Sequence, residues 1–100
     1  MGRRKKAARV LIVKHYTLEI DKDALKFIRG LKESDQRRIT RKIDLLADDP
    51  RPYGSLKLKG NSGLHRVRAG NFRILYSVND GKLMVIVITV DDRKDVYKGL

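Results

Sequence analysis

The amino-acid sequence predicts an α+β domain in which two N-terminal helices pack on a twisted antiparallel sheet, in the order β-α-α-β-β-β-β. Apolar residues recur at helical spacing through residues 24–46, whereas apolar and polar residues alternate between turn signals from Ser55 onward. A chain of 100 residues is large enough for one core. We therefore expect a single domain at residues 15–100, preceded by a basic N-terminal extension at residues 1–14 whose charge also fits a disordered tail.

A short strand and a first helix are expected at the start of the domain. Residues 16–20 alternate apolar and polar side chains, as a half-buried strand does. Asp21 or Asp23 can then cap a helix that ends near Gly30. The apolar face of this helix is expected to consist of Ala24, Phe27, Ile28 and Leu31.

A second helix is expected to begin with Ser34 as its N-cap and to end in the proline-containing segment 48–52. Its buried stripe is expected to consist of Ile39, Ile43 and Leu46. Because only a short turn at residues 32–33 would join the two helices, we expect an antiparallel helical hairpin on one face of the sheet.

Turn chemistry predicts how the later strands pair. The strands are expected at residues 56–58, 64–69, 72–78 and 83–90. Gly70-Asn71 suits a two-residue type II′ turn, because glycine takes the central position where φ is positive. Asp80-Gly81 suits a type I′ turn, in which both central residues have positive φ. The sequence therefore predicts two consecutive hairpins.

The charge balance indicates a polyanionic partner, and the composition makes several kinds of site improbable. The chain has 24 Lys and Arg against 12 Asp and Glu, a net charge of +12. It has no cysteine, and its two histidines, His15 and His65, are far apart, so we expect no disulfide and no metal site. The longest apolar run, residues 83–90, is far shorter than the roughly 20 residues of a membrane span, and the run at 10–13 is too short for a signal peptide. We expect a cytoplasmic protein with no membrane partner.

Three arginines are predicted to share the outer face of the first hairpin. If Gly70-Asn71 forms the turn, Arg68 lies directly opposite Arg73 and Arg66 lies opposite Leu75, while the other side of the hairpin belongs to the core. Like charges opposed across strands destabilise a sheet unless an anion screens them, and guanidinium groups match phosphate oxygens well. The segment 52–79 also contains no acid, and its basic residues are Lys57, Lys59, Arg66, Arg68 and Arg73. A phosphate is the natural candidate for that anion.

The arginines could instead have no ligand-binding role, and the apolar residues on the same face need a cover. Each arginine could be merely solvated, or could pair with an acid of a partner chain or with Asp91, Asp92 or Asp95. The face also carries apolar side chains that need a cover, namely Leu75, Met84, Ile86 and Ile88. The cover could be residues 10–13, the C-terminal segment or a partner protein, and an acidic partner would also neutralise the charge.

Three segments resemble the RelE branch of the RelE/ParE toxin superfamily. They are LHRVRAGNFRILY at residues 64–76, VIVITV at 85–90 and DRKDVY at 92–97, and the similarity spans about residues 16–98. The resemblance implies a RelE-like fold and the toxin of a type II toxin–antitoxin pair, with a cognate acidic antitoxin as partner. It also implies a ribosome-dependent endoribonuclease that enters the ribosomal A site and cuts messenger RNA through attack of a 2′-hydroxyl on the adjacent phosphate, without a cofactor.

The resemblance also implies roles for individual residues. The catalytic residues of the family fall here on Arg66, Arg68, Arg73, Arg93 and Tyr97. Arg73 and Arg93 would hold the scissile phosphate, because negative charge builds up there during in-line attack. Arg66 and Arg68, with Lys57 and Lys59, would bind the flanking RNA. Tyr97 would stack on a base or take a proton.

The sequence departs from the family pattern at two positions. An arginine replaces a lysine on the third strand, and Asp92 stands where many relatives have a histidine, so no conventional general base is evident. His65 is predicted to point toward the core beside Tyr76 rather than toward RNA. The alternatives are a ParE-like toxin that inhibits DNA gyrase through protein contacts, and an RNA-binding or ribosome-binding module without chemistry.

Overall fold

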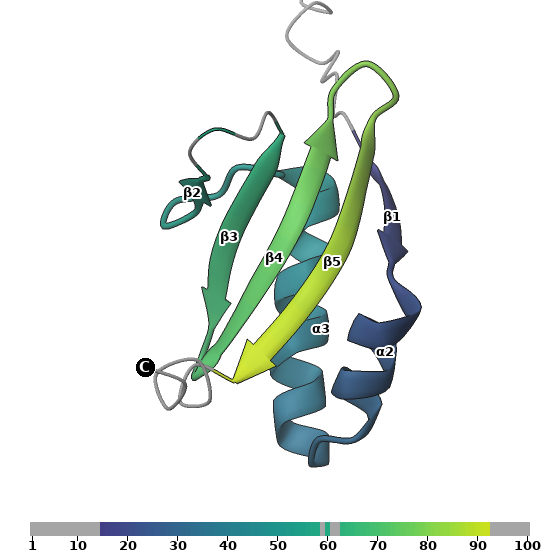
Figure 1. The fold of residues 1–100 in the computed structure, drawn as a ribbon, viewed down its shortest axis with the longest axis vertical. Coiled ribbons are helices and arrows are strands. Elements are labelled where there is room, and N and C mark those ends of the chain that lie inside the picture. The colour runs from purple at the N-terminus through teal and green to yellow at the C-terminus, as the bar shows by residue number, and fades with distance from the viewer. Residues whose placement is uncertain (1–14, 59, 61–62, 93–100) are drawn as a thin grey trace, which may run out of the picture.

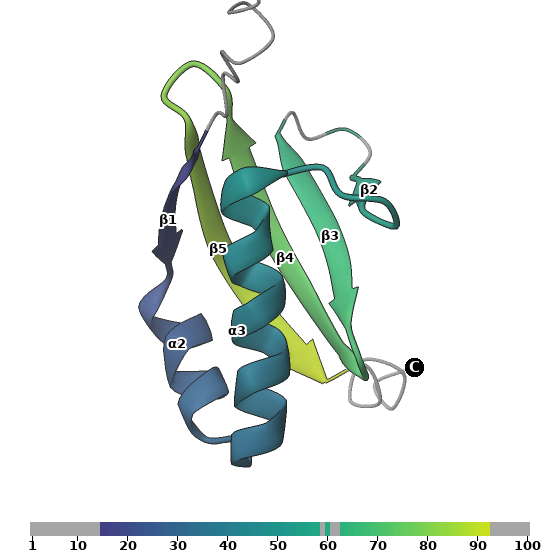
Figure 2. The same cartoon turned by 180° about the vertical axis from the view of Figure 1, so that it is seen from behind.

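The computed structural model describes residues 15–58, 60 and 63–92, which form one five-stranded sheet with two helices on one face (Figures 1 and 2). The elements follow the predicted order β-α-α-β-β-β-β. They are β1 (Thr17–Ile20), α2 (Lys22–Arg29), α3 (Glu33–Asp48), β2 (Leu56–Lys57), β3 (Leu64–Ala69), β4 (Phe72–Asn79) and β5 (Met84–Asp92). None of these helices is long and apolar enough to cross a bilayer. The predicted extension at residues 1–14 lies outside the described residues.

The sheet has the strand order β1-β5-β4-β3-β2 and is mixed. The pairings from β2 to β5 are antiparallel, as predicted, but β1 runs parallel to β5, from Thr17 opposite Met84 to Ile20 opposite Val87. The expectation of a wholly antiparallel sheet is therefore wrong at this edge. Alternation of side chains does not encode strand direction, and the long connection that a parallel pair requires is present between β1 and β5.

The first helix begins and ends as expected. The Asp21 carboxylate accepts a hydrogen bond from the Asp23 backbone N–H (3.1 Å), and Gly30 closes the helix through N–H bonds to the carbonyl groups of its last turn. Ala24 and Ile28 are buried. Asp21, one of the two predicted caps, is therefore the N-cap of the first helix.

The second helix begins two residues before the expected point, so the prediction of Ser34 as N-cap is wrong. Helix α3 starts at Glu33, and its N-cap Lys32 makes no side-chain hydrogen bond. The Gln36 amide instead donates to the Leu31 carbonyl oxygen at 2.7 Å, which fixes the inter-helix connection to the first turn. This bond ties the first turn to the connection before it, but unlike a capping bond it satisfies no backbone N–H group at the start of the helix.

The core lies between the helices and one face of the sheet. Ile39, Ile43 and Leu46 of α3 are buried as predicted. They share the core with the inward side chains of the sheet, of which Ile74, Tyr76, Val85 and Val87 are completely buried. Phe27 of α2 meets Phe72 of β4 edge to face, with ring centres 6.2 Å apart. The opposite face of the sheet is not covered by any described helix (Figure 1).

The two predicted turns differ in outcome. Gly70 has φ +64° and Asn71 is not in the positive-φ region, as in a type II′ turn. The prediction of a type I′ turn at Asp80-Gly81 is wrong. Asn79 pairs with Met84, so the connection is four residues long, and its positive-φ residue is Leu83 (+51°). The Asn79 side chain accepts a hydrogen bond from the Lys82 N–H (2.9 Å), which stabilises this longer loop.

The last strand is longer than predicted and contains a bulge. It continues to Asp92 instead of ending at residue 90. Its register with β4 shifts between Leu75 and Tyr76, which pair with Thr89 and Val87, so one residue of β5 is unpaired there. The extra length brings Asp91 and Asp92 into the sheet.

Candidate functional site

The three predicted arginines lie together on the sheet face that the helices leave open. Arg68 is directly opposite Arg73, and Arg66 is opposite Leu75, as the Gly70-Asn71 turn predicted. The intervening residues Val67 and Ile74 are buried, so the arginines point away from the core. Arg68 is exposed, and Arg66 and Arg73 are partly exposed. These guanidinium groups are therefore accessible to a ligand.

Their lack of acidic partners distinguishes them from several arginines elsewhere in the chain. Arg51 pairs with Asp80 (2.8 Å), Arg37 with Glu33 (3.3 Å) and, more loosely, Arg38 with Asp35 (3.9 Å). Within the described residues, no ion pair and no side-chain hydrogen bond involves the three arginines of the open face. The sheet therefore holds two like charges in direct opposition without an internal salt bridge, an arrangement that costs stability unless an anion is bound.

A shallow pocket of about 180 Å³ lies among these side chains. It is lined by Leu58, Arg66, Arg73, Leu75 and Asp91. Pockets for drug-sized ligands usually span about 300–1,000 Å³, so this one suits a single phosphate group better than a larger molecule. The pocket has two guanidinium groups against the single carboxylate of Asp91, so its net charge is positive and favours phosphate oxygens, which guanidinium forks bind bidentately.

Asp91 was one of the acids considered as partners for the arginines, and the structure places it directly opposite Arg73. Asp92 lies opposite Phe72 instead. Although no ion pair joins Arg73 to Asp91 in the described part of the chain, opposite charges on facing positions attract each other across a sheet. Asp91 thus offsets part of the repulsion at Arg73, whereas Arg66 and Arg68 have no carboxylate opposite them.

The remaining predicted site residues lie elsewhere or outside the described residues. Lys57 pairs with His65, so it stands on the other side of the sheet from Arg66, at the β2 edge. Sequence reasoning did not foresee this, because the register of the two-residue strand β2 has no local turn signal. Lys59, Arg93 and Tyr97 lie outside the described residues.

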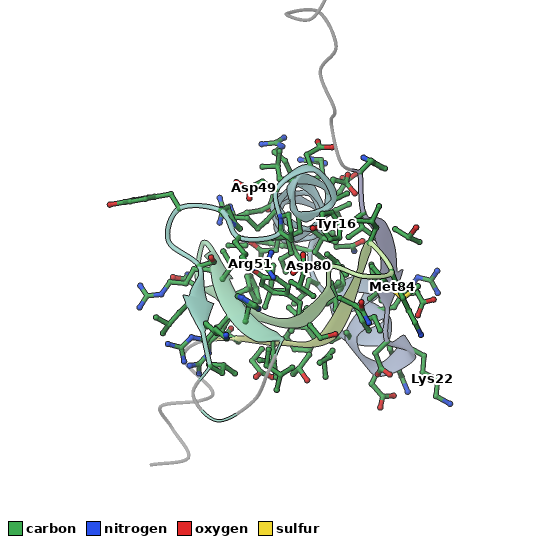
Figure 3. The ribbon with its side chains drawn as sticks, turned by 90° about the horizontal axis from the view of Figure 1, so that it is seen from above. Tyr16, Lys22, Asp49, Arg51, Asp80 and Met84 are labelled. Carbon is green, nitrogen blue, oxygen red and sulfur yellow. The ribbon has the colours of Figure 1, made fainter. Side chains whose placement is uncertain are left out.

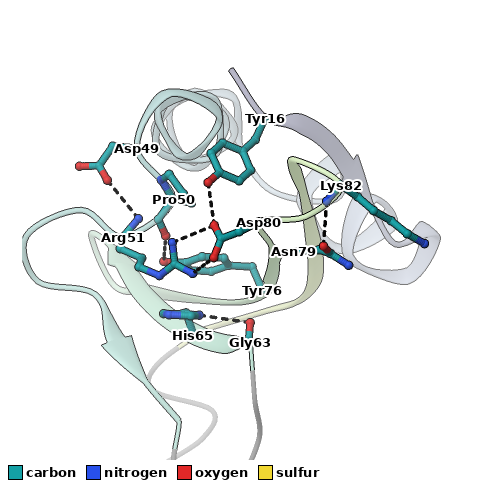
Figure 4. Close-up of polar contacts among 10 residues, drawn as sticks. All are labelled: Tyr16, Asp49, Pro50, Arg51, Gly63, His65, Tyr76, Asn79, Asp80 and Lys82. Carbon is teal, nitrogen blue, oxygen red and sulfur yellow. Dashed lines mark hydrogen bonds and ion pairs between the residues drawn. The ribbon is translucent and has the colours of Figure 1, made fainter. Parts of the chain in front are cut away.

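His65 belongs to the core, as predicted. It is 4% exposed, its ring stacks on Tyr76 with centres 5.5 Å apart, and its Nδ1 lies 3.2 Å from the Gly63 carbonyl oxygen (Figure 4). The Tyr76 hydroxyl donates to the Pro50 carbonyl oxygen at 2.8 Å, and burial raises the pKa of this tyrosine. These two rings hold the end of the sheet that lies beside the segment after α3.

A polar cluster at that end was not predicted. The Tyr16 hydroxyl donates to the Asp80 carboxylate (2.7 Å), and Arg51 donates to both oxygens of the same group (2.8 and 3.2 Å; Figures 3 and 4). The hydrogen bond to Asp80 is the main cause that raises the pKa of Tyr16, and Asp80 also raises the pKa of Arg51. The three residues are far apart in the sequence and share no motif, so no sequence signal could have identified them.

The chemistry available on the open face is that of fixed cations. Among the described residues, no group of three or more histidine, cysteine or acidic side chains could hold a metal ion. Arginines remain charged at any cellular pH, so they can stabilise a developing negative charge but cannot act as efficient bases near neutrality.

Comparisons with known proteins agree with this architecture. The family described as ParE toxin of type II toxin-antitoxin system, parDE, matches residues 15–97. The putative toxin RelE1 of Methanocaldococcus jannaschii is 30% identical over 86 residues, which cover 83% of this chain and 96% of that protein. The mRNA interferase toxin RelE of Escherichia coli K12 is 31% identical over 86 residues, covering 82% of this chain and 90% of the relative.

Solved structures give the same result. The isolated E. coli RelE toxin superposes with a TM-score of 0.68 at 30% identity, covering 84% of this chain and 93% of that one. A chain of the RelE–RelB complex from Pyrococcus horikoshii OT3 superposes with a TM-score of 0.72 at 28% identity, covering 79% and 96%. The matching family, the relatives and the shared fold together show that the chain belongs to the RelE/ParE superfamily of toxins from type II toxin–antitoxin systems.

Proposed function

We propose that this protein is a ribosome-dependent endoribonuclease that cleaves messenger RNA in the ribosomal A site, in the cytoplasm. The observation that carries the proposal is the direct opposition of Arg68 and Arg73 beside a small pocket on the open sheet face. A fold that only had to be stable would gain nothing from this pair, whereas a phosphodiester would bridge it. The relatives named mRNA interferase support the same activity.

The reaction would be an internal phosphoryl transfer. The ribose 2′-oxygen forms a bond to the adjacent phosphorus and loses its proton, while the bond from phosphorus to the 5′-oxygen breaks and that oxygen takes up a proton. The products are a cyclic phosphate and a 5′-hydroxyl. Negative charge increases on the phosphate during attack, and preorganised cations stabilise it.

Each site residue has a role in this proposal. Arg73 would bind the scissile phosphate, joined by Arg93, whose role follows from the family resemblance alone. Arg66 and Arg68 would hold the flanking backbone and favour ionisation of the 2′-hydroxyl. Tyr97, again from the resemblance, would stack on a base or accept the proton.

An acidic antitoxin is proposed as the protein partner. The neighbours from P. horikoshii and E. coli are RelE toxins in complexes with antitoxins. This chain has a net charge of +12 and partly exposed apolar side chains on the open face, including Leu75 and Ile86. An acidic segment with apolar anchors would therefore complement this face.

The decisive test is primer extension on total RNA after brief induction of the protein, with Arg73→Ala beside the wild type. We expect cuts inside translated regions for the wild type and none for the variant. Arg29→Ala, which removes an exposed arginine from α2, is the matched control and should cleave normally. Circular dichroism and thermal unfolding must show that Arg73→Ala folds, and undiminished cleavage by the folded variant would refute the proposal.

Inhibition of DNA gyrase is the second candidate, because the matching family is described as ParE. A supercoiling assay with purified gyrase separates the two. Gyrase inhibition that survives Arg73→Ala, together with uncut messages, would establish the ParE-like activity. RNA binding without either effect would indicate a module that has no chemistry.

A further inference from the structure

A second basic surface runs along the β3 edge of the molecule. One groove of about 390 Å³ lies between α3 and the β3–β4 turn, and a neighbouring groove of about 400 Å³ lies between α3, the segment before β2, and β3. Lys42 and Arg68 line both grooves, so the two are continuous. We call the combined surface the edge groove, and its basic lining residues are Arg37, Arg38, Arg41, Lys42, Arg66 and Arg68.

All the charged side chains that line the edge groove are basic. No aspartate or glutamate of the described residues lines either of its parts. Arg41, Lys42 and Arg68 have no ion pair to any described residue. Arg37 and Arg38 pair only with acids one turn earlier on α3: the Arg37–Glu33 pair is exposed, where such pairs are worth about 0.3–0.5 kcal/mol, and the Arg38–Asp35 pair is long, at 3.9 Å. All these cations can therefore turn toward an external anion at little cost.

An aromatic side chain stands beside the cations. Tyr53 lines the part of the groove formed by Arg66 and Arg68, and its relative exposure is 104%, so its ring is open to solvent. Single exposed apolar residues are common on protein surfaces. A fully exposed tyrosine next to a track of arginines, however, is the arrangement that binds single-stranded nucleic acids, with phosphates on the cations and a base stacked on the ring.

We propose that the edge groove binds a stretch of single-stranded RNA backbone outside the cleavage pocket, with Tyr53 stacked on an unpaired base. Arg66 and Arg68 belong to both surfaces, so a bound strand passes from α3 across the β3 edge toward the open face. The choice of RNA over DNA rests on the proposed function. Binding itself does not require cleavage, and the groove residues of α3 take no part in the chemistry proposed above.

The test is fluorescence anisotropy of the full chain with a labelled single-stranded 2′-O-methyl RNA, which lacks the 2′-hydroxyl needed for cleavage. The key variant is Arg41→Ala with Lys42→Ala, and the matched control is Lys22→Ala with Lys26→Ala, which removes the same charge from α2. We expect the α3 variant to lower the slope of log affinity against log salt by about 0.7 for each phosphate that it no longer neutralises. The α2 control should leave the slope unchanged.

Tyrosine substitutions test the stacking step. We expect Tyr53→Ala to weaken binding by about fivefold or more and Tyr53→Phe to leave it nearly unchanged, because the ring and not the hydroxyl stacks. Since Tyr53 is fully exposed, neither change should affect the unfolding temperature.

Three outcomes would overturn the proposal. Equal losses of RNA affinity and of salt dependence in the α3 variant and the α2 control would mean that only the overall charge attracts RNA. An unchanged RNA affinity of Tyr53→Ala would show that no base stacks on Tyr53. Tighter binding of an acidic polyglutamate peptide than of RNA, lost in the same α3 variant, would assign the groove to a protein partner. Because the RNA cannot be cleaved, these results are independent of whether the cleavage proposal survives.

Discussion

The opposed arginines should make the protein less stable than it could be, and Arg68→Thr tests this directly. The change removes one of two facing like charges at an exposed position and introduces a residue that favours strands. Facing like charges cost from a few tenths to about 1 kcal/mol. For a domain of this size, where 1 kcal/mol corresponds to roughly 4–8 °C, we expect the melting temperature to rise by about 1–8 °C.

The salt dependence and two controls make the measurement specific. The gain should be largest near 0.01 M salt, where the screening length is about 30 Å, and should shrink near 0.15 M, where it is about 8 Å. Arg66→Thr removes the same charge opposite Leu75 and should give no comparable gain. Asp91→Asn removes the carboxylate opposite Arg73 and should lower stability by a few tenths of a kcal/mol.

The assay is thermal unfolding followed by circular dichroism across this salt range. A fall in melting temperature for Arg68→Thr at low salt would refute the reasoning, as would an equal gain for Arg66→Thr. If the reasoning holds, Arg68→Thr will be more stable and will bind RNA less well. That combination is characteristic of a position kept for function at the expense of stability.

Three further predictions concern the fold. Gly70→Ala should lose about 1 kcal/mol or more in urea unfolding, because φ is +64° there and the new Cβ would lie 2.7 Å from the Arg38 guanidinium; unchanged stability would contradict this. Tyr76→Phe should lose about 1–2 kcal/mol, because it leaves the Pro50 carbonyl without its buried donor, and a loss below a few tenths would show that this bond matters little. Folding raises the pKa of Tyr16, so the protonated hydroxyl stabilises the folded state fully below the unfolded pKa of about 10. This contribution is lost as pH rises through the folded pKa. The urea midpoint of Tyr16→Phe should therefore fall less steeply above pH 10 than that of the wild type. Parallel curves for the two proteins would show that the Tyr16 hydroxyl contributes nothing to this pH dependence.

Local chemistry explains which parts of the fold the sequence predicted. Gly70 requires a particular turn, the turn fixes a register, and the register places Arg68 opposite Arg73. The β4–β5 connection was mispredicted because the Asn79 side chain stabilises a longer loop than the Asp80-Gly81 pair suggested. The prediction from turn residues therefore held at Gly70, where glycine supplies the positive φ, and failed at residues 80–83, where the Asn79 side chain at the end of β4 accepts a hydrogen bond within the loop.

Features that depend on contacts between distant parts of the chain could not be predicted from the sequence. Strand β1 pairs with the distant β5 and runs parallel to it, and alternation in residues 16–20 encodes neither the partner nor the direction. The position of Asp91 opposite Arg73 depends on how far β5 continues beyond residue 90. Of the candidate site, the arginines of one hairpin could be predicted, whereas Asp91, which lies opposite Arg73, belongs to a strand whose end had no signal in the sequence.

The polar cluster of Tyr16, Arg51 and Asp80 has a practical consequence. It fastens the sheet at the end of β4 near Asn79, while Arg73 lies six residues away at the other end, a distance of roughly 20 Å along an extended strand. The residues that stabilise the sheet and the arginine that would bind an anion therefore lie at opposite ends of β4. A variant changed only at Arg66, Arg68 and Arg73 should therefore keep its fold, and if the proposed activity holds, it would be a harmless bait for isolating the proposed antitoxin.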